Sequence, residues 1–175
     1  MGTERLEHTA STFAAYAVAV AVLCLALIAT SALHLVLWGT DGVSFPYPLL
    51  LVFVPLTVAH EWLHGVGFRL AGAPWSAIDF GFSVRRLTPF ARCAAPLPAA
   101  GYRRSVVLPA LLLGVVPAAI GLALGCFWVT VVGATMIGAA GGDLAVLWAI
   151  RAVPGHTLVR DHPSKPGCLV VPVDD

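Results

Sequence analysis

The segment PLLLVFVPLTVAHEWLHGVGFRLA, residues 48–71, carries the strongest indication of the fold of this chain. It is long enough to cross a bilayer as one helix, which takes about 20 mostly apolar residues. Yet it carries His60, Glu61, His64 and Arg69. A charged side chain at the middle of a membrane costs roughly 2.5 to 3.5 kcal/mol on insertion scales, and such residues are retained where they serve a function. The segment therefore predicts both a membrane helix and a functional site within it.

Three more membrane helices are predicted from the remaining apolar runs. Of the 175 residues, 59% are apolar and 11% are charged, whereas soluble domains carry roughly 25% charged residues. Between Val106 and Ile150 the only charged side chain is Asp143. At ~1.5 Å per residue this run is about twice as long as the bilayer core is thick, so we expect it to turn back near Gly125. We predict an all-α membrane protein, a single domain over 1–175, with four transmembrane helices at about 12–38, 48–71, 105–125 and 127–150.

The positions of the basic residues predict how these helices are oriented. If both termini lie on one side of the membrane, every basic residue lies there too: Arg5, Arg69, Arg85, Arg86, Arg92, Arg103, Arg104, Arg151, Arg160 and Lys165. By the positive-inside rule, both termini and the loop at 72–104 are cytoplasmic in a multi-pass protein of the cell membrane. A cleaved signal peptide is the alternative for the N-terminus, but the first apolar run is too long for it. The lipid bilayer is thus an expected partner, and no basic tract predicts a nucleic-acid partner.

The sequence His60-Glu61-Trp62-Leu63-His64 has the spacing of a zinc site on a helix. Residues four apart share one helix face, so both imidazoles can bind a single ion. Glu61 lies about 100° around the helix from His60, where it can reach a water at the metal without binding the metal itself. The alternative is a polar helix face that is hydrogen-bonded to neighbouring helices and binds no metal.

Asp143 is the expected third zinc ligand. A catalytic zinc has three protein ligands and one open position. Counted back from Arg151 and Arg69, which mark the same membrane surface, Asp143 and the histidine pair lie at similar depth. The alternative for Asp143 is a carboxylate that orients a ligand histidine through a hydrogen bond. We expect His34 to make helix contacts, and we expect His156 and His162 to lie outside the membrane.

The loop between the second and third helices predicts a small β-hairpin within 76–94. Apolar residues at Ile78, Phe80, Phe82 and Val84 alternate with small or polar residues, which is the pattern of a half-buried strand. One interpretation is a hairpin that caps the bundle on the cytoplasmic side. The other is an edge strand that binds an extended substrate, with Phe80 and Phe82 as contact residues. The tail at 151–175 is expected to pack under the cytoplasmic face or to be loose.

The HExxH motif and the single Asp two helices later resemble the intramembrane site-2-protease type of zinc metallopeptidase. The chain also resembles a family of small bacterial membrane proteins described as zincin peptidases and classed as a domain of unknown function. That second resemblance covers roughly residue 54 to the end, and it is carried by His60 to Gly65, Cys93 to Leu97, Tyr102-Arg103, Leu108-Pro109, Gly114, Pro117, Gly141 to Leu144 and Asp161 to Pro163.

Both resemblances imply a zinc-dependent peptidase with Zn²⁺ as cofactor. His60, His64 and Asp143 would bind zinc, Glu61 would act as the base, and the substrate would be a membrane protein or a peptide. Two alternatives remain. One is a non-catalytic metal-binding membrane scaffold or regulatory protein, which would not need Glu61. The other is a metal carrier or sensor, with haem binding by His34 together with His60 or His64 as a variant.

Overall fold

The computed structural model describes residues 7–40, 43, 49–84 and 88–171. Four helical stretches in it are long and apolar enough to cross a membrane: Thr12–Trp38, Leu51–Leu70, Ala99–Ala123 and Phe127–Ala149. The four predicted helices are therefore confirmed, in a mostly helical chain that also has two small sheets. Arg5, Arg85 and Arg86, which contributed to the predicted orientation, lie outside the described residues.

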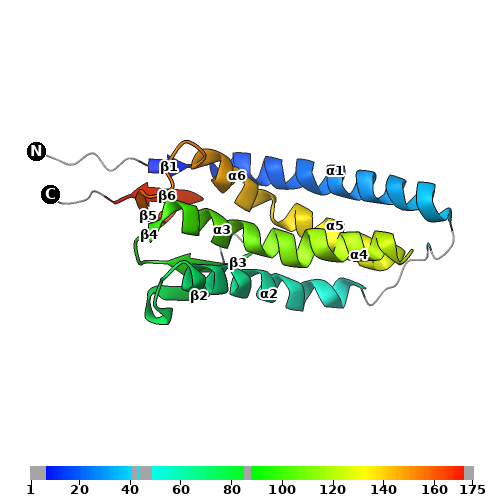
Figure 1. Ribbon diagram of the computed structural model, residues 1–175, viewed down its shortest axis with the longest axis horizontal. Helices are drawn as coiled ribbons and strands as arrows, with labels where there is room; N and C mark the ends of the chain where they lie inside the picture. Colours follow the sequence, from blue (N-terminus) through cyan, green and yellow to red (C-terminus); the bar gives the residue numbers. More distant parts are fainter. Residues whose placement is uncertain (1–6, 41–42, 44–48, 85–87, 172–175) are drawn as a thin grey trace, which may run out of the picture.

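The first two spans are continuous helices, α1 (Thr12–Trp38) and α2 (Leu49–Leu70). The hydroxyl of Ser11 caps α1 by accepting a hydrogen bond from the backbone N–H of Ala14. Within α1 the buried residues are Ala15 and His34, and the helix runs along the outside of the bundle (Figure 1). A helix that is apolar on all sides and yet exposed suits a lipid environment.

The third and fourth spans are each interrupted. α3 (Ala99–Pro109) continues through a π-helical segment, η2 (Ala110–Val115), into α4 (Val116–Ala123). After a turn at Gly125, which has a φ of 68°, α5 (Phe127–Ala139) is separated from α6 (Gly141–Ala149) at Ala140. The third span begins at Ala99, ahead of the expected start at 105. The helix can include Arg103 because its guanidinium donates hydrogen bonds to the backbone carbonyls of Ile150 and Val153. The charged group therefore does not have to be exposed to water.

Small residues allow the spans to pack closely. α1 packs against α5 and α6, α2 packs against α3, and α4 packs against α5. A Cβ atom added at Gly133 would lie 2.3 Å from the backbone nitrogen of Ala118, and one at Gly141 would lie 2.2 Å from the Cα of Ala19. Side chains larger than hydrogen are therefore excluded at these helix crossings, as is common where membrane helices associate.

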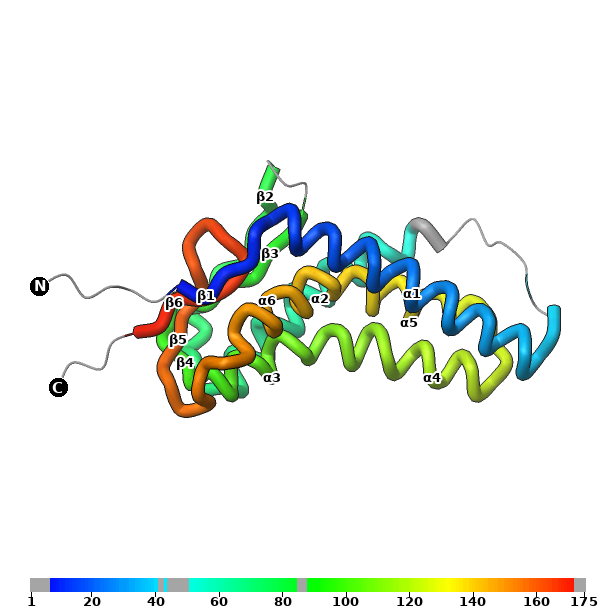
Figure 2. The backbone as a smooth tube through the Cα atoms, turned by 90° about the horizontal axis from the view of Figure 1, so that it is seen from above, coloured from blue at the N-terminus to red at the C-terminus, as the bar shows by residue number. Residues whose placement is uncertain are grey.

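The strands gather at one end of the bundle (Figures 1 and 2). After a 3₁₀ turn, η1 (Trp75–Ala77), strands β2 (Ile78–Ser83) and β3 (Thr88–Cys93) form an antiparallel hairpin. A second sheet was not predicted from the sequence. Its strand order is β1 (Glu7–Thr9), β6 (Gly167–Val170), β5 (Leu158–Asp161) and β4 (Leu97–Pro98). It joins the segment before α1 to the tail, so the described part of the tail, which ends at Val171, is packed rather than loose.

Candidate metal centre

His60 and His64 lie one turn apart on α2 and face the interior of the bundle. Their ring centroids are 4.9 Å apart, and each residue is 7% exposed. Nδ1 of His64 lies 3.0 Å from the backbone carbonyl oxygen of Ser105 on α3. Because a carbonyl only accepts hydrogen bonds, Nδ1 of this imidazole carries a proton. Nε2 of His64, which faces Asp143, is therefore the atom that could bind a metal in the neutral imidazole.

A close approach of α2 to α3 places Ser105 beside His64. A Cβ added at Gly67 would lie 2.6 Å from the Cα of Ser105, so only glycine permits this distance between the helices. The hydrogen bond to a backbone carbonyl orients the imidazole and fixes its tautomer, as is usual for metal-binding histidines. Nδ1 of His60 is different, because it is buried and has no hydrogen-bond partner among the described residues.

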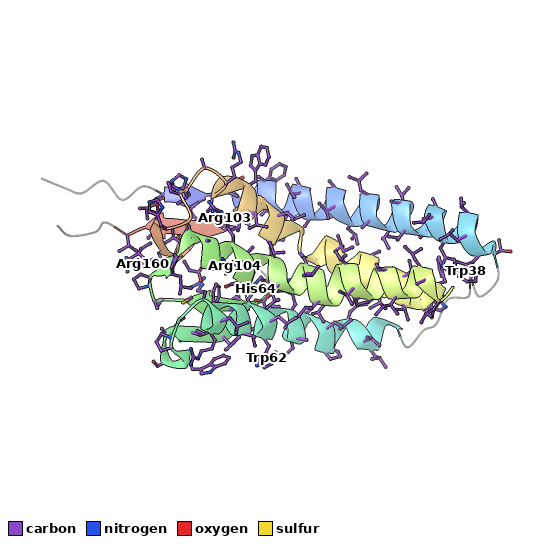
Figure 3. The ribbon with its side chains drawn as sticks, viewed as in Figure 1. Trp38, Trp62, His64, Arg103, Arg104 and Arg160 are labelled. Carbon is purple, nitrogen blue, oxygen red and sulfur yellow. The ribbon has the colours of Figure 1, made fainter. Side chains whose placement is uncertain are left out.

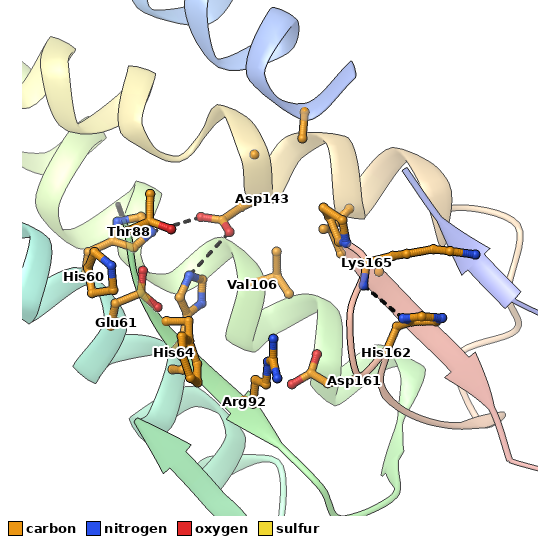
Figure 4. Close-up of a pocket in the computed structure, with 18 of the residues that line it drawn as sticks. His60, Glu61, His64, Thr88, Arg92, Val106, Asp143, Asp161, His162 and Lys165 are labelled. Atoms are coloured by element: carbon orange, nitrogen blue, oxygen red, sulfur yellow. Dashed lines mark hydrogen bonds and ion pairs between the residues drawn. The ribbon is translucent and has the colours of Figure 1, made fainter. Parts of the chain in front are cut away.

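Asp143 reaches the two histidines from the first turn of α6. Its Oδ2 lies 3.1 Å from Nε2 of His60, and its Oδ1 lies 3.4 Å from Nε2 of His64. In Figure 4 the carboxylate faces both imidazoles from across the pocket. The break at Ala140 starts a new helix just before Asp143, so the carboxylate also lies at the positive end of the α6 dipole.

These three side chains fit a zinc ion. One ligand atom from each of His60, His64 and Asp143 lies within 4.8 Å of the others. Two ligands bound tetrahedrally to zinc at about 2.0 to 2.1 Å are separated by about 3.3 Å. The 3.1 Å from Oδ2 of Asp143 to His60 and the 3.4 Å from its Oδ1 to His64 are close to that separation, each for a different oxygen of the carboxylate. Three protein ligands would leave one coordination position open, which is the arrangement of a catalytic rather than a structural zinc site.

Glu61 lies next to this group without belonging to it. Its side chain lines the same pocket as the three candidate ligands, and the backbone N–H of Ala91 on β3 interacts with its carboxylate. A carboxylate that borders an open coordination position can accept a proton from water there. The arrangement therefore offers a candidate metal site and, beside it, a carboxylate that could act as a general base.

The pocket around these residues has a volume of about 320 Å³. Its walls come from α1, α2, β3, α3, the end of α5 and α6, and from the hairpin formed by β5 and β6. β3 rather than β2 borders the pocket, through residues 88–92. The volume is at the small end of the range for ligand sites, about 300 to 1,000 Å³.

A hydrogen-bonded group around the buried carboxylate of Asp161 connects the pocket to the second sheet. The residue patterns in the sequence did not predict this group. The hydroxyl of Tyr102 donates to Oδ1 of Asp161 at 2.5 Å, and the backbone N–H of Cys93 donates to Oδ2 at 2.6 Å. Burial raises the pKa of the Asp161 carboxyl above its usual value of 3.8. Tyr102 and Asp161 did occur among the residues that carry the family resemblance, which was the one signal that could have found them.

The other residues considered from the sequence lie apart from the three candidate ligands. Phe80 and Phe82 are on β2 with 47% and 57% of their surfaces exposed, and the ring of Phe80 packs over Gly65. His34 is fully buried in α1 with its ring 5.1 Å from that of Phe127. His162 borders the opposite end of the pocket, where its Nδ1 accepts hydrogen bonds from the backbone N–H groups of Ser164 and Lys165.

Fold and site together define a helical protein with four potential membrane spans and a zincin-like set of two histidines, a glutamate and an aspartate. The family model described as "Putative zincin peptidase" matches residues 50–158, and the chain belongs to this family. The matched range runs from α2 into β5 and contains all four of these residues. No curated protein and no solved structure matches the chain.

Proposed function

We propose that this protein is a zinc-dependent metallopeptidase that hydrolyses peptide bonds of membrane-associated substrates. The observation that carries the proposal is the spacing of the donor atoms of His60, His64 and Asp143, which come from two helices, beside a glutamate that is not a ligand. Zinc bound there would polarise a peptide carbonyl and make a water molecule more acidic. Glu61 would accept the proton of the attacking water and return it to the leaving amine.

The site would lie inside the membrane, nearer to the cytoplasmic surface. In Figure 3, Arg103, Arg104 and Arg160 lie at the end of the molecule that carries the sheets, Trp38 lies at the opposite end, and His64 lies between them, nearer to the arginines. The positive-inside rule assigns the arginine-rich end to the cytoplasm. Both termini would then be cytoplasmic in a protein of the cell membrane.

The outer edge of β3 would hold the substrate in an extended form. Along an antiparallel strand, alternate residues direct their backbone groups away from the partner strand. Cys93 does so, because its N–H binds Asp161, and therefore Ala91 and Pro89 do so as well. Pro89 has no N–H, and the N–H groups of Ala91 and Cys93 already donate to Glu61 and Asp161. A substrate segment would therefore pair with this edge by donating its own N–H groups to the carbonyls of β3. A segment paired with this edge would expose its carbonyls to the metal site, and the half-exposed rings of Phe80 and Phe82 would supply apolar contacts nearby.

The test compares wild-type protein with Glu61→Gln, each purified in detergent with its zinc content measured. Both are incubated with a digest of bacterial membrane proteins, and new peptide termini are detected by mass spectrometry. We expect termini that form with wild type and decrease by about 10² to 10⁴-fold with Glu61→Gln at equal zinc content. Equal patterns for the two proteins would contradict the peptidase and would favour the non-catalytic metal-binding scaffold.

A further inference from the structure

Arg92 is a cation in the pocket that makes no direct ion pair with any of the described residues. It extends from β3 and lies between His64 and Asp161 in the pocket (Figure 4). Its neighbour across the strand pair is Asp79, but no ion pair joins the two. Its Cζ lies 4.7 Å from the centroid of the Phe90 ring, and the Asp161 carboxylate is near enough to interact with it electrostatically. A guanidinium offers five donors that match a carboxylate in pairs, so these donors are available to a ligand.

The other charged groups at this end of the pocket are already paired. Both carboxylate oxygens of Asp161 accept hydrogen bonds, from Tyr102 and from the backbone of Cys93. Lys165 donates to Oε2 of Glu7 at 2.8 Å, and the imidazole of His162 lies 3.6 Å from the same carboxylate. Within the described residues that line the pocket, Arg92 is thus the cation whose guanidinium makes no direct hydrogen bond or ion pair, although it lies near the Asp161 carboxylate.

The position of Arg92 along β3 indicates where that anion would lie. Ala91, the preceding residue, is the one whose backbone interacts with Glu61. A strand advances about 3.3 Å per residue, and a substrate paired with β3 advances at the same rate. When its reacting peptide bond lies beside Glu61, the group one residue further along lies level with Arg92. In a peptide that ends at this residue, the group is the terminal carboxylate.

We propose that the pocket accepts the carboxy-terminal end of a peptide and that Arg92 binds the terminal carboxylate. The proposal rests on the proposed function and specifies its substrate as a chain with a free carboxy terminus, from which the last residue is removed. Water adds across the last peptide bond. Its hydroxyl goes to the carbonyl carbon, the C–N bond breaks, and the amine of the released amino acid takes a proton. The small volume of the pocket suits the end of a chain.

Binding tests this proposal separately from catalysis. The probe is a fluorescein-labelled hexapeptide of alanine and leucine, prepared as the free acid and as the carboxy-terminal amide. Fluorescence anisotropy gives its Kd for the zinc-loaded Glu61→Gln protein in detergent, alone and combined with Arg92→Gln. Arg104→Gln is the matched control, because Arg104 is exposed on α3 and does not line the pocket.

We expect the free acid to bind about tenfold or more tightly than the amide, since hydrogen bonds to charged groups contribute about 1.5 to 3 kcal/mol. This preference should disappear with Arg92→Gln and persist with Arg104→Gln. Equal Kd values for acid and amide, or no measurable binding of either, would overturn the proposal. So would a preference that survives Arg92→Gln. An acid preference in a protein that cleaves neither peptide when Glu61 is intact would instead refute the peptidase and leave the carboxylate site standing.

Discussion

Nδ1 of His64 donates a hydrogen bond to the backbone carbonyl of Ser105, and this bond links the metal-binding face of α2 to α3. A carbonyl oxygen in an unbroken α-helix normally accepts from the N–H four residues later. Ser105 lies shortly before the π-helical segment that starts at Ala110. In that segment the backbone hydrogen bonds no longer follow the α-helical pattern. The orientation of a candidate zinc ligand is therefore coupled to the packing of α2 against α3.

Gly67→Ala should weaken zinc binding without touching a ligand. The new methyl group would lie 2.6 Å from the Cα of Ser105, so α2 and α3 must separate and the bond from His64 to Ser105 must lengthen. Loss of such a supporting contact typically lowers metal affinity by about 10 to 100-fold. Competition with a fluorescent zinc chelator measures the affinity. An unchanged affinity would mean that this contact does not orient His64.

A neighbouring pair of glycines provides a matched comparison at Asp143. Gly141→Ala would place a methyl group 2.2 Å from the Cα of Ala19, whereas a Cβ at Gly142 meets nothing within 4 Å. We expect Gly141→Ala to displace α6 from α1 and to lower both the Tm and the zinc affinity. Gly142→Ala should keep the zinc affinity and add up to about 1 kcal/mol of stability through helix propensity. Equal effects of the two changes on Tm and affinity would contradict the close contact of α6 with α1.

Stability should depend on pH through Asp161. Burial raises the pKa of this carboxyl above 3.8 in the folded protein, although the hydrogen bonds from Tyr102 and Cys93 act in the opposite direction. The folded state therefore holds the proton more tightly than the unfolded chain. The stabilisation from this group is complete below pH ~3.8 and is lost as the pH rises through the raised pKa.

Asp161→Asn removes this titration and leaves Glu7 and His162 in place. The Tm of Asp161→Asn relative to that of wild type should therefore increase as the pH is raised from about 4 to 7. Thermal unfolding in detergent, followed by tryptophan fluorescence at each pH, gives this difference. A difference that decreases with pH would show that the hydrogen bonds to the ionised carboxylate outweigh the effect of burial.

The sequence predicted the parts of this fold that depend on local patterns. Long apolar runs predicted the four spans, the period of two at Ile78 to Val84 predicted the hairpin, and Gly125 predicted the turn between the last two spans. The i, i+4 spacing of His60 and His64 placed both on one helix face. Asp143 and the two histidines lie at similar distances along the chain from Arg151 and Arg69, which mark the same membrane surface. This spacing predicted that Asp143 lies at the same depth in the membrane as the histidines. Each of these inferences needs only the geometry of one element or the thickness of a bilayer.

Features that depend on contacts between distant segments were not predicted. The second sheet joins Glu7–Thr9 to a hairpin near the end of the chain, and each of its strands is too short to show a period. The bond from Asp161 to Tyr102 connects residues 59 positions apart. The prediction that Phe80 and Phe82 contact substrate stays a prediction, and the strand pattern behind it does not specify that β3 is the strand beside the pocket. No local signal distinguished Arg92 from the other arginines of the loop.

The zinc content of the purified protein tests the central claim most directly. Wild type, His60→Ala, Asp143→Ala and the control His156→Ala, which changes an exposed histidine outside the pocket, are purified in detergent and analysed by inductively coupled plasma mass spectrometry. We predict about one zinc per chain in wild type and His156→Ala, as three ligands at a single site require, and loss of zinc in the other two variants. Absence of zinc from wild type after reconstitution, or full retention of zinc in Asp143→Ala, would contradict the three-ligand site.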